Sequence, residues 1–362
     1  MVKVLVAMSG GVDSSMAAAL LVEQGHDVTG VHLKMADTPS GLPGKGCCTL
    51  DDARDARRVA DHVGIAFAVW DFSAAFAERV VDDFVSEYEA GRTPNPCVRC
   101  NERVKYAALL DRARALGFDA LATGHHVRLR RDGDGTAHLW RAADADKDQT
   151  YVLYMAGQDQ LAATLWPVGE YPKSSLRAMA AERGLLTAAK PDSSDICFIP
   201  DGDVAGFLRP RLGQRAGTFV GADGATLGDH DGAYRFTVGQ RRGLGLSGRS
   251  EPLYVTAVDG RQVHVGSREQ LRCSRLHATG VSWIAGQHPP SADTGLSAQV
   301  RYRGRALPCD IDVAGDVAQV RFPDEEPEGV APGQAVVFYA GQECLGGGTI
   351  SKSWSQSSAA TA

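Results

Sequence analysis

Three cysteines lie in sequence surroundings that could support thiol chemistry. Cys97 and Cys100 form a C-x-x-C pair that follows two prolines, and Cys197 ends a polar segment that leads into an apolar run. The thiolate is the reactive form of cysteine, and a helix N-terminus or a nearby cation favours it over the thiol. We expect extended chain at the prolines and a helix starting near Arg103, which would place Cys100 beside its first turn and close to Arg99.

Each cysteine also has an ordinary interpretation. A C-x-x-C pair is half of many zinc sites, but no second pair with ligand spacing completes one here, so we assign no metal site. The same pattern occurs in thioredoxin-like redox pairs, and a single cysteine such as Cys197 is more often a small buried apolar residue. We expect the remaining cysteines to serve packing: Cys47, Cys48, Cys273, Cys309 and Cys344.

A glycine-rich loop near the amino terminus could bind phosphate. Its sequence, SGGVDSS from Ser9 to Ser15, lies between an apolar strand and an alanine-rich helix. The glycines allow a tight turn, and the helix then directs unpaired N–H groups and its positive dipole end at an anion. Asp13 could hold Mg²⁺ or orient the loop. The loop lacks a Walker A lysine and the G-x-G-x-x-G spacing, and the ordinary alternative is a glycine turn that caps a helix.

Strands and helices that would position these residues alternate over the first two hundred residues. This alternation predicts crossover connections and an α/β fold with a doubly wound, mostly parallel sheet. We expect strands at 2–7, 28–33, 65–70 and 120–123, and helices at 14–23, 51–63, 103–116 and 174–183.

Glycine turns between short β-branched runs replace this pattern after about Asp201. We expect strands at 254–258, 263–265, 299–302, 318–322 and 335–339. They predict a small central domain followed by a C-terminal β-barrel. The predicted units are a catalytic domain, a central domain, the barrel and a disordered tail, at residues 1–202, 203–275, 276–353 and 354–362.

Composition narrows the class of protein. The chain has 362 residues, of which 44% are apolar and 23% charged, and it lacks the run of roughly 18 apolar residues that a membrane span needs. We expect a cytoplasmic, multidomain protein with reduced thiols and no membrane partner. The net charge of -6 argues against a nucleic-acid partner, but residues 201–275 carry 11 Lys and Arg against 8 Asp and Glu. An RNA footprint should therefore draw on that segment.

Taken together, the glycine loop and the cysteine segments resemble the tRNA 2-thiouridylases, a family of pyrophosphate-loop ATPases. The loop is similar to the S-G-G-x-D-S-S pattern of enzymes that split ATP between its α and β phosphates. Further matching segments run over nearly the whole chain, at 46–53, 122–126, 147–151, 236–243, 300–303 and 331–335. The resemblance implies an adenine nucleotide α-hydrolase-like fold for the N-terminal domain and an enzyme that replaces a uridine oxygen with sulfur.

The resemblance also implies roles for single residues. Cys100 is implied to be the catalytic nucleophile, and Cys197 to carry the persulfide. ATP contacts are implied for Ala7, Met8, Ser9, Gly10, Gly11, Val12, Asp13, Ser14, Ser15, Leu33 and Gly124. Contacts with the target base are implied for Asn95, Pro96 and Cys97, and contacts with tRNA for His125, Lys147, Asp148, Gln149, Arg301, Tyr302 and Gln334. His125 could equally line the pocket.

The resemblance implies a reaction and its participants. ATP and Mg²⁺ are the implied cofactors, tRNAs for Lys, Glu and Gln the substrates, and a cysteine desulfurase or sulfur relay protein the persulfide donor. The wobble uridine would be adenylated at O2, and the persulfide sulfur would attack C2. Cys100 would either free the sulfide first or resolve the persulfide afterwards, which leaves a disulfide bond between Cys100 and Cys197.

One position departs from the family pattern. Many members have Asp where this chain has Cys97, and that Asp is assigned a general acid/base role. A thiol with a reference pKa of about 8.5 moves a proton differently from a carboxylate of about 3.9. Cys97 also offers a second disulfide partner.

Two other functions stay open, namely an adenylating ligase or amidotransferase for a small molecule, and a non-catalytic, redox-sensing RNA-binding protein.

Overall fold

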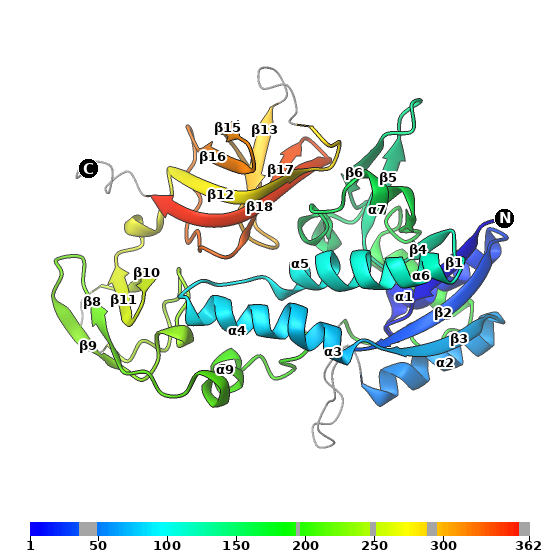
Figure 1. Ribbon diagram of the computed structural model, residues 1–362, viewed down its shortest axis with the longest axis horizontal. Coiled ribbons are helices and arrows are strands. Elements are labelled where there is room, and N and C mark those ends of the chain that lie inside the picture. Colours follow the sequence, from blue (N-terminus) through cyan, green and yellow to red (C-terminus); the bar gives the residue numbers. More distant parts are fainter. Residues whose placement is uncertain (36–48, 193–195, 247–250, 288–294, 355–362) are drawn as a thin grey trace.

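The computed structural model describes residues 1–35, 49–192, 196–246, 251–287 and 295–354 (Figure 1). Five parallel strands form the sheet of the N-terminal domain in the order β3-β2-β1-β4-β7. In that order they are Ala66–Asp71, Asp27–Lys34, Lys3–Ala7, Ala120–Ala122 and Thr164–Leu165. The chain moves outward from β1 to β3 and then returns to place β4 on the other side of β1. Such a reversal of strand order opens a crevice at the carboxyl ends of the two strands.

Helices cover both faces of this sheet. Val4 and Val6 of β1 face an apolar layer that they share with the helices α1 (Val12–Glu23), α2 (Leu50–Val63) and α8 (Lys173–Glu182). Leu5 faces the opposite layer, which contains residues of η2 (Asn101–Leu109) and α6 (Leu110–Ala115). Because successive side chains of a strand point to opposite faces, one short apolar strand serves both layers. The predicted doubly wound α/β fold is confirmed.

The helix that carries the paired cysteines begins earlier than the sequence analysis placed it. The expected start near Arg103 is wrong, because α5 (Pro96–Cys100) already begins at Pro96 and continues into η2. Asn95 is the N-cap, and its side chain accepts a hydrogen bond from the backbone N–H of Cys97. Proline is well suited to the first helical position because it lacks an N–H that would need a partner. Cys97 therefore lies in the first turn and Cys100 one turn further along.

A second helical segment runs beside α5. It consists of α3 (Ser73–Phe76), η1 (Ala77–Val81) and α4 (Asp82–Glu89), which follow one another without a break. Figure 1 shows α4 running across the middle of the molecule from the side of the parallel sheet toward the central domain, with α5 above it. The shorter helices are η3 (Ala145–Lys147), η4 (Thr150–Val152), α7 (Gln158–Ala162), η5 (Ala233–Arg235) and η6 (Glu269–Leu271). In the described ranges, no helix has the length and apolar character needed to cross a bilayer.

The central domain is a small sheet preceded by the helix α9 (Val204–Leu212). Its strands follow the order β10-β11-β8-β9. Phe219 and Phe236 lie in its buried core with ring centroids 5.0 Å apart. The strand bounds are Gly217–Val220 for β8, Thr226–His230 for β9, Tyr254–Asp259 for β10 and Gln262–Gly266 for β11.

The C-terminal domain is a strongly paired antiparallel sheet in the order β14-β13-β17-β18-β12-β16-β15. Its strands are β12 (Arg275–Trp283), β13 (Leu296–Gln299), β14 (Leu307–Pro308), β15 (Asp310–Ala314), β16 (Val317–Arg321), β17 (Ala335–Ala340) and β18 (Glu343–Trp354). The strand expected at 299–302 is wrong beyond Gln299, because the chain turns there and Arg303 adopts a φ of 59°. Trp354 belongs to β18 and not to the predicted tail, whose other residues lie outside the described ranges.

A hairpin that the sequence analysis missed joins the first domain to the last. It is formed by β5 (Val127–Arg131) and β6 (Ala137–Arg141). The strand β6 pairs with β18, where Trp140 lies opposite Glu343 and Leu139 opposite Cys344. The C-terminal sheet is therefore built partly from the N-terminal domain, which fixes the two domains against each other.

The close approach of Gly169 to the hairpin predicts an effect on stability. A Cβ atom on Gly169 would lie 1.7 Å from the backbone oxygen of Val127, the first residue of β5. Gly169→Ala should lower the free energy of unfolding by about 2 kcal/mol, because the backbone must shift to relieve the overlap. The measurement is urea unfolding followed by circular dichroism. Gly133→Ala, where nothing lies within 4 Å, is the control and should change little. Equal stability of the two variants would contradict the packing.

Candidate functional site

The glycine loop lies at the carboxyl end of β1, at the reversal of strand order. Gly11 is the N-cap of α1, and no side chain caps this helix. Gly10 has a φ of 77°, and a Cβ atom there would lie 2.3 Å from the backbone oxygen of Asp52, so the position requires glycine. The loop thus presents uncapped backbone N–H groups and a positive helix end, which together favour an anion.

The serine hydroxyls mostly stabilise the loop from within. The hydroxyls of Ser14 and Ser15 donate to the carbonyl oxygen of Gly11 at 3.1 and 2.9 Å. Ser9 is exposed, and its Oγ lies 3.3 Å from that of Ser14. Ser9 is therefore the hydroxyl best placed to reach an incoming ligand, while Ser14 and Ser15 hold the turn.

The other predicted nucleotide residues gather at the same edge. Gly124 follows β4, and a Cβ atom on it would lie 2.6 Å from the backbone N of Ser14. Leu33 is buried near the end of β2, beside β1. The structure brings Ala7, Leu33, Gly124 and the loop together at the carboxyl ends of β1, β2 and β4.

A cluster of charged side chains binds Asp13 in the first turn of α1. The Lys173 ammonium donates to both carboxylate oxygens of Asp13, at 2.7 and 2.6 Å, and Nε2 of His126 lies 3.0 Å from Oδ1. Burial alone would raise the pKa of Asp13, but His126 and Lys173 together hold it below its usual value. Sequence reasoning missed both partners. His126 lay beside a predicted residue, whereas no local pattern marks Lys173.

These contacts bear on the two expectations for Asp13. Both of its oxygens are bound to a lysine, which suits orientation of the loop better than coordination of Mg²⁺. Among the described residues, no group of three or more His, Cys, Asp and Glu could hold a metal ion. Mg²⁺ usually binds through phosphate oxygens and few carboxylates, so it would have to reach this site on the nucleotide.

The paired cysteines differ in exposure. Cys97 is half-buried in the first turn of α5, whereas Cys100 is 8% exposed, with its Sγ 3.9 Å from Sδ of Met35. Met35 follows Leu33 by two residues. The buried thiol therefore touches the chain that leaves the nucleotide edge of the sheet.

The arginines near this pair are engaged elsewhere. Nη1 of Arg103 donates to Asp83 at 2.8 Å, and Nη1 of Arg99 donates to Glu102 at 3.0 Å. Carboxylates thus neutralise both cations, and the expectation that they favour a Cys100 thiolate is not supported by their geometry. The start of the helix, closest to Cys97, is another local source of positive potential.

The segment of Cys197 is anchored by aromatic contacts of the next residue, Phe198. The ring of Phe198 lies 5.7 Å from Phe76, 5.3 Å from Phe84 and 5.3 Å from Phe207, measured between centroids. Cys97 and Cys197 are both partly buried against the apolar cluster that contains Cys100. Both cysteine segments therefore pack against one large apolar cluster, and a meeting of Cys100 with Cys197 stays a prediction.

Two predicted tRNA contacts are used inside the protein. The Asp148 carboxylate accepts hydrogen bonds from Arg141 at 2.8 Å and from the Thr150 hydroxyl at 2.7 Å. Gln149 accepts one from the backbone N–H of His126 at 2.8 Å. In the structure, these bonds fix the segment that follows the hairpin against Arg141 and His126. RNA contact by Asp148 and Gln149 stays a prediction.

The predicted C-terminal contacts reach the cysteine segment from the other side. Nε2 of Gln334 donates to the backbone oxygen of Thr93 at 2.9 Å. Burial raises the pKa of Tyr302, and negative charge on the nearby Cys97 raises it further. Arg301 is exposed beside it. The C-terminal domain therefore supplies part of the surroundings of Cys97.

His125 lies inside the protein. Its Nδ1 is 2.7 Å from the Thr123 hydroxyl and 3.1 Å from that of Tyr106, which also accepts a hydrogen bond from Trp166 at 2.9 Å. Burial, followed by the charge of Lys105, holds the pKa of His125 well below 6.5. This position favours pocket lining, and RNA contact by His125 remains a prediction.

The described cysteines are all free of disulfide bonds. Cys273, Cys309 and Cys344 are buried, in agreement with the packing role. Burial raises the pKa of Cys273 to about 11 and that of Cys309 to about 12, so these thiols are unreactive near neutral pH. Cys47 and Cys48 lie outside the described residues.

Family models match the whole architecture. The model described as "tRNA methyl transferase HUP domain" matches residues 2–201, "tRNA methyl transferase PRC-barrel domain" residues 205–267, and "Aminomethyltransferase beta-barrel domain" residues 273–350. The first model alone covers more than half of the chain. The protein is therefore of the class in which a HUP domain is followed by two β domains.

Curated relatives narrow the class to one family. The tRNA-specific 2-thiouridylase MnmA of Acidothermus cellulolyticus is 53% identical over 357 residues, which cover 97% of this chain and 98% of that protein. The proteins of the same name from Geobacter metallireducens and Mycobacteroides abscessus are each 50% identical, over 96% and 97% of this chain and 96% and 99% of theirs. The chain belongs to the tRNA-specific 2-thiouridylase family, and the predicted resemblance is confirmed.

Solved structures are more distant. A 4-thiouridine synthetase in complex with RNA and ATP gives a TM-score of 0.35 at 15% identity, over 55% of this chain and 45% of that one. The NMN synthetase of Francisella tularensis gives 0.33 at 16%, over 53% and 67%. At these scores the likeness carries no argument about function.

The burial of His125 predicts a pH effect on stability. At pH 7.5 the imidazole is neutral in both folded and unfolded chains. Below about pH 6.5 the unfolded chain gains a proton that the buried ring does not take up, so the free energy of unfolding falls. Between pH 7.5 and 5.5, wild type should lose about 1 kcal/mol more than His125→Gln. Urea midpoints at both pH values measure this, with His264→Gln as control. A loss that is the same in wild type and His125→Gln would refute it.

Proposed function

We propose that the protein converts a uridine of tRNA to 2-thiouridine, with ATP consumed as a substrate and sulfur delivered as a cysteine persulfide. The contact between Met35 and Cys100 carries this proposal. Met35 continues the chain from Leu33 at the nucleotide edge of the sheet, and its side chain touches the buried thiol. An adenylating sulfurtransferase needs such a connection between an anion site and a cysteine thiol.

The first step activates an oxygen. O2 of the uridine attacks the α-phosphorus of ATP, and the bond to the pyrophosphate breaks. The N–H groups at the start of α1, behind Gly11, stabilise the negative charge that develops on the departing pyrophosphate. Asp13 fixes the position of these donors, and Mg²⁺ would accompany the phosphates.

The second step exchanges oxygen for sulfur. The terminal sulfur of a persulfide on Cys197 attacks C2, and AMP leaves with the former O2. The Cys100 thiolate then attacks Sγ of Cys197, so the sulfur-sulfur bond breaks, thiouridine is released and a disulfide forms between the two cysteines. A dithiol reductant must reopen it. In the other order, Cys100 attacks the persulfide first and frees the sulfide.

The target base would approach the segment from Asn95 to Cys97. This segment begins α5, lies beside Tyr302 and is attached to the C-terminal domain through Thr93 and Gln334. A base inside an anticodon stack must be flipped out to reach an enclosed site. Cys97 would then be the nearest thiol to the base, in the place where many members of the family carry Asp.

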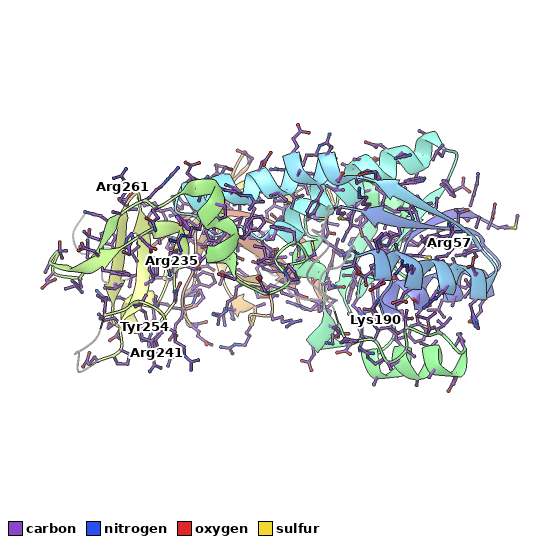
Figure 2. All side chains as sticks on the ribbon, turned by 90° about the horizontal axis from the view of Figure 1, so that it is seen from below. Arg57, Lys190, Arg235, Arg241, Tyr254 and Arg261 are labelled. Carbon is purple, nitrogen blue, oxygen red and sulfur yellow. The ribbon has the colours of Figure 1, made fainter. Side chains whose placement is uncertain are left out.

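The central domain would add electrostatic attraction for RNA. Figure 2 shows Arg235, Arg241, Tyr254 and Arg261 on this domain at one end of the molecule, and Arg57 at the other. Arg241 and Arg261 are exposed. The proposed substrates are the tRNAs for Lys, Glu and Gln, the proposed donor is a cysteine desulfurase or relay protein, and the proposed location is the cytoplasm.

Other functions fit less well. The family descriptions name methyl transfer, but the full-length relatives are thiouridylases, and identity over the whole chain is the more specific match. An adenylating ligase for small molecules would leave the cysteine cluster without a role. A zinc-dependent redox switch lacks a metal cluster among the described residues.

The cysteine roles can be tested by substitution. With ATP, unmodified tRNA and a persulfide donor, Cys100→Ser and Cys197→Ser should each reduce thiouridine formation to background, because each breaks the sulfur path. Chromatography of digested tRNA measures the product. Cys273→Ser, a buried cysteine of a different apolar cluster, is the control. Full activity in either first variant would refute the two-cysteine path, and loss of adenylation in Cys97→Ser would assign that thiol to proton transfer.

The RNA surface makes a separate prediction. In Arg241→Gln/Arg242→Gln, tRNA affinity should fall, and the slope of log K against log salt should flatten by about 1.8 if both residues contact phosphate. Filter binding between 50 and 200 mM salt measures both quantities, with Arg54→Gln/Arg57→Gln at the opposite end as control. Equal slopes in the two double variants would exclude these contacts.

A further inference from the structure

Lys173 is a buried cation to which the reaction sequence above gives no part. It is the first residue of α8, and 10% of its side chain is exposed. A cation at the start of a helix faces the positive end of the dipole, and burying its charge is costly unless it is paired. Placement of a lysine here therefore requires the carboxylate of Asp13, which it binds through both oxygens.

The surroundings of Lys173 are positively polarised from two directions. The helices α1 and α8 pack against the same layer and start side by side, since Asp13 of α1 meets Lys173 of α8. Their ends are joined in the same way, because Glu23 accepts a hydrogen bond from Arg183 at 2.6 Å. Two helix N-termini and an ammonium group thus converge beside the glycine loop, where an anion is stabilised.

A second carboxylate occupies the other side of the ammonium group. Oδ1 of Asp192 lies 3.1 Å from Nζ of Lys173. Asp192 is also bound by Lys147 at 2.9 Å and by Arg177 at 2.9 Å. Burial opposes the charge of Asp192, but these cations hold its pKa far below the usual value, so it is an anion at any ordinary pH.

The two carboxylates on Lys173 are not equivalent. Asp13 binds it through both oxygens, whereas Asp192 contacts it through one oxygen, has 42% of its side chain exposed and keeps two other cations. Replacing Asp192 by a phosphate oxygen costs Asp192 one of three partners. The same exchange gives phosphate a charge-assisted hydrogen bond, which is stronger than a neutral one.

We propose that Lys173 is a phosphate-binding residue of the nucleotide site. Asp13 keeps its ammonium group beside the glycine loop, and Asp192 occupies the anion position until a phosphate takes it. Lys173 thereby supplies the cation that the loop itself lacks. The inference rests on the proposed function only in taking the anion to be the pyrophosphate part of ATP.

The test is binding of inorganic pyrophosphate and of ATP to the full chain by isothermal titration calorimetry. Lys173→Met should weaken both by about tenfold or more, the usual size of a hydrogen bond to a charged group. Asp192→Asn should tighten binding severalfold in wild type and have no effect in the Lys173→Met background. Arg183→Met, which breaks the matching pair at the other ends of the helices, should leave affinity within about twofold.

A further variant separates phosphate binding by Lys173 from neutralisation of Asp13. If Lys173 only neutralises Asp13, Asp13→Asn/Lys173→Met should regain wild-type affinity, whereas loss of a phosphate contact should persist. Recovery in this variant, unchanged affinity in Lys173→Met, or weaker binding in Asp192→Asn would each overturn the inference. The assay needs neither tRNA nor a sulfur donor, so thiouridine formation by wild type tests the proposed function separately.

Discussion

Two parallel helices that start side by side repel each other through their like dipole ends, and the carboxylate of Asp13 lies where that repulsion is greatest. It neutralises the ammonium of Lys173 and also accepts from His126. This one carboxylate supports the orientation of the glycine loop. It also supports the position of His126 and the start of α8. A short polar side chain in the first turn of α1 thus links three regions that are distant in sequence.

The sequence predicted the parts whose cause is local. A short apolar strand, a glycine turn and an alanine-rich helix specify β1, the loop and α1 without reference to the rest of the chain. The ion pair between Asp13 and Lys173 joins residues 160 positions apart, and no periodicity marks either partner. Such long-range charge pairs become visible only when the topology places two helix starts together.

Two misses had a local signal that was given too little weight. The alternating runs around Gly133 and Gly135 are typical of a hairpin, and they form β5 and β6. Asn95 before Pro96 is typical of a capped helix start, but the two prolines suggested extended chain instead. Strand β13 shows the opposite case, because it ends at Gln299 and the chain then turns, with left-handed backbone at Arg303 that a β-branched pattern does not reveal.

The pairing of β6 with β18 has a consequence for biosynthesis. A ribosome synthesises the chain from the amino terminus, so the residues of the hairpin exist long before their partners Glu343 and Cys344. During that interval β6 is an open strand edge, which can pair with other chains. Only the last stretch of translation closes it. Truncation near the carboxyl terminus would therefore leave this edge of the hairpin unpaired and open to other chains.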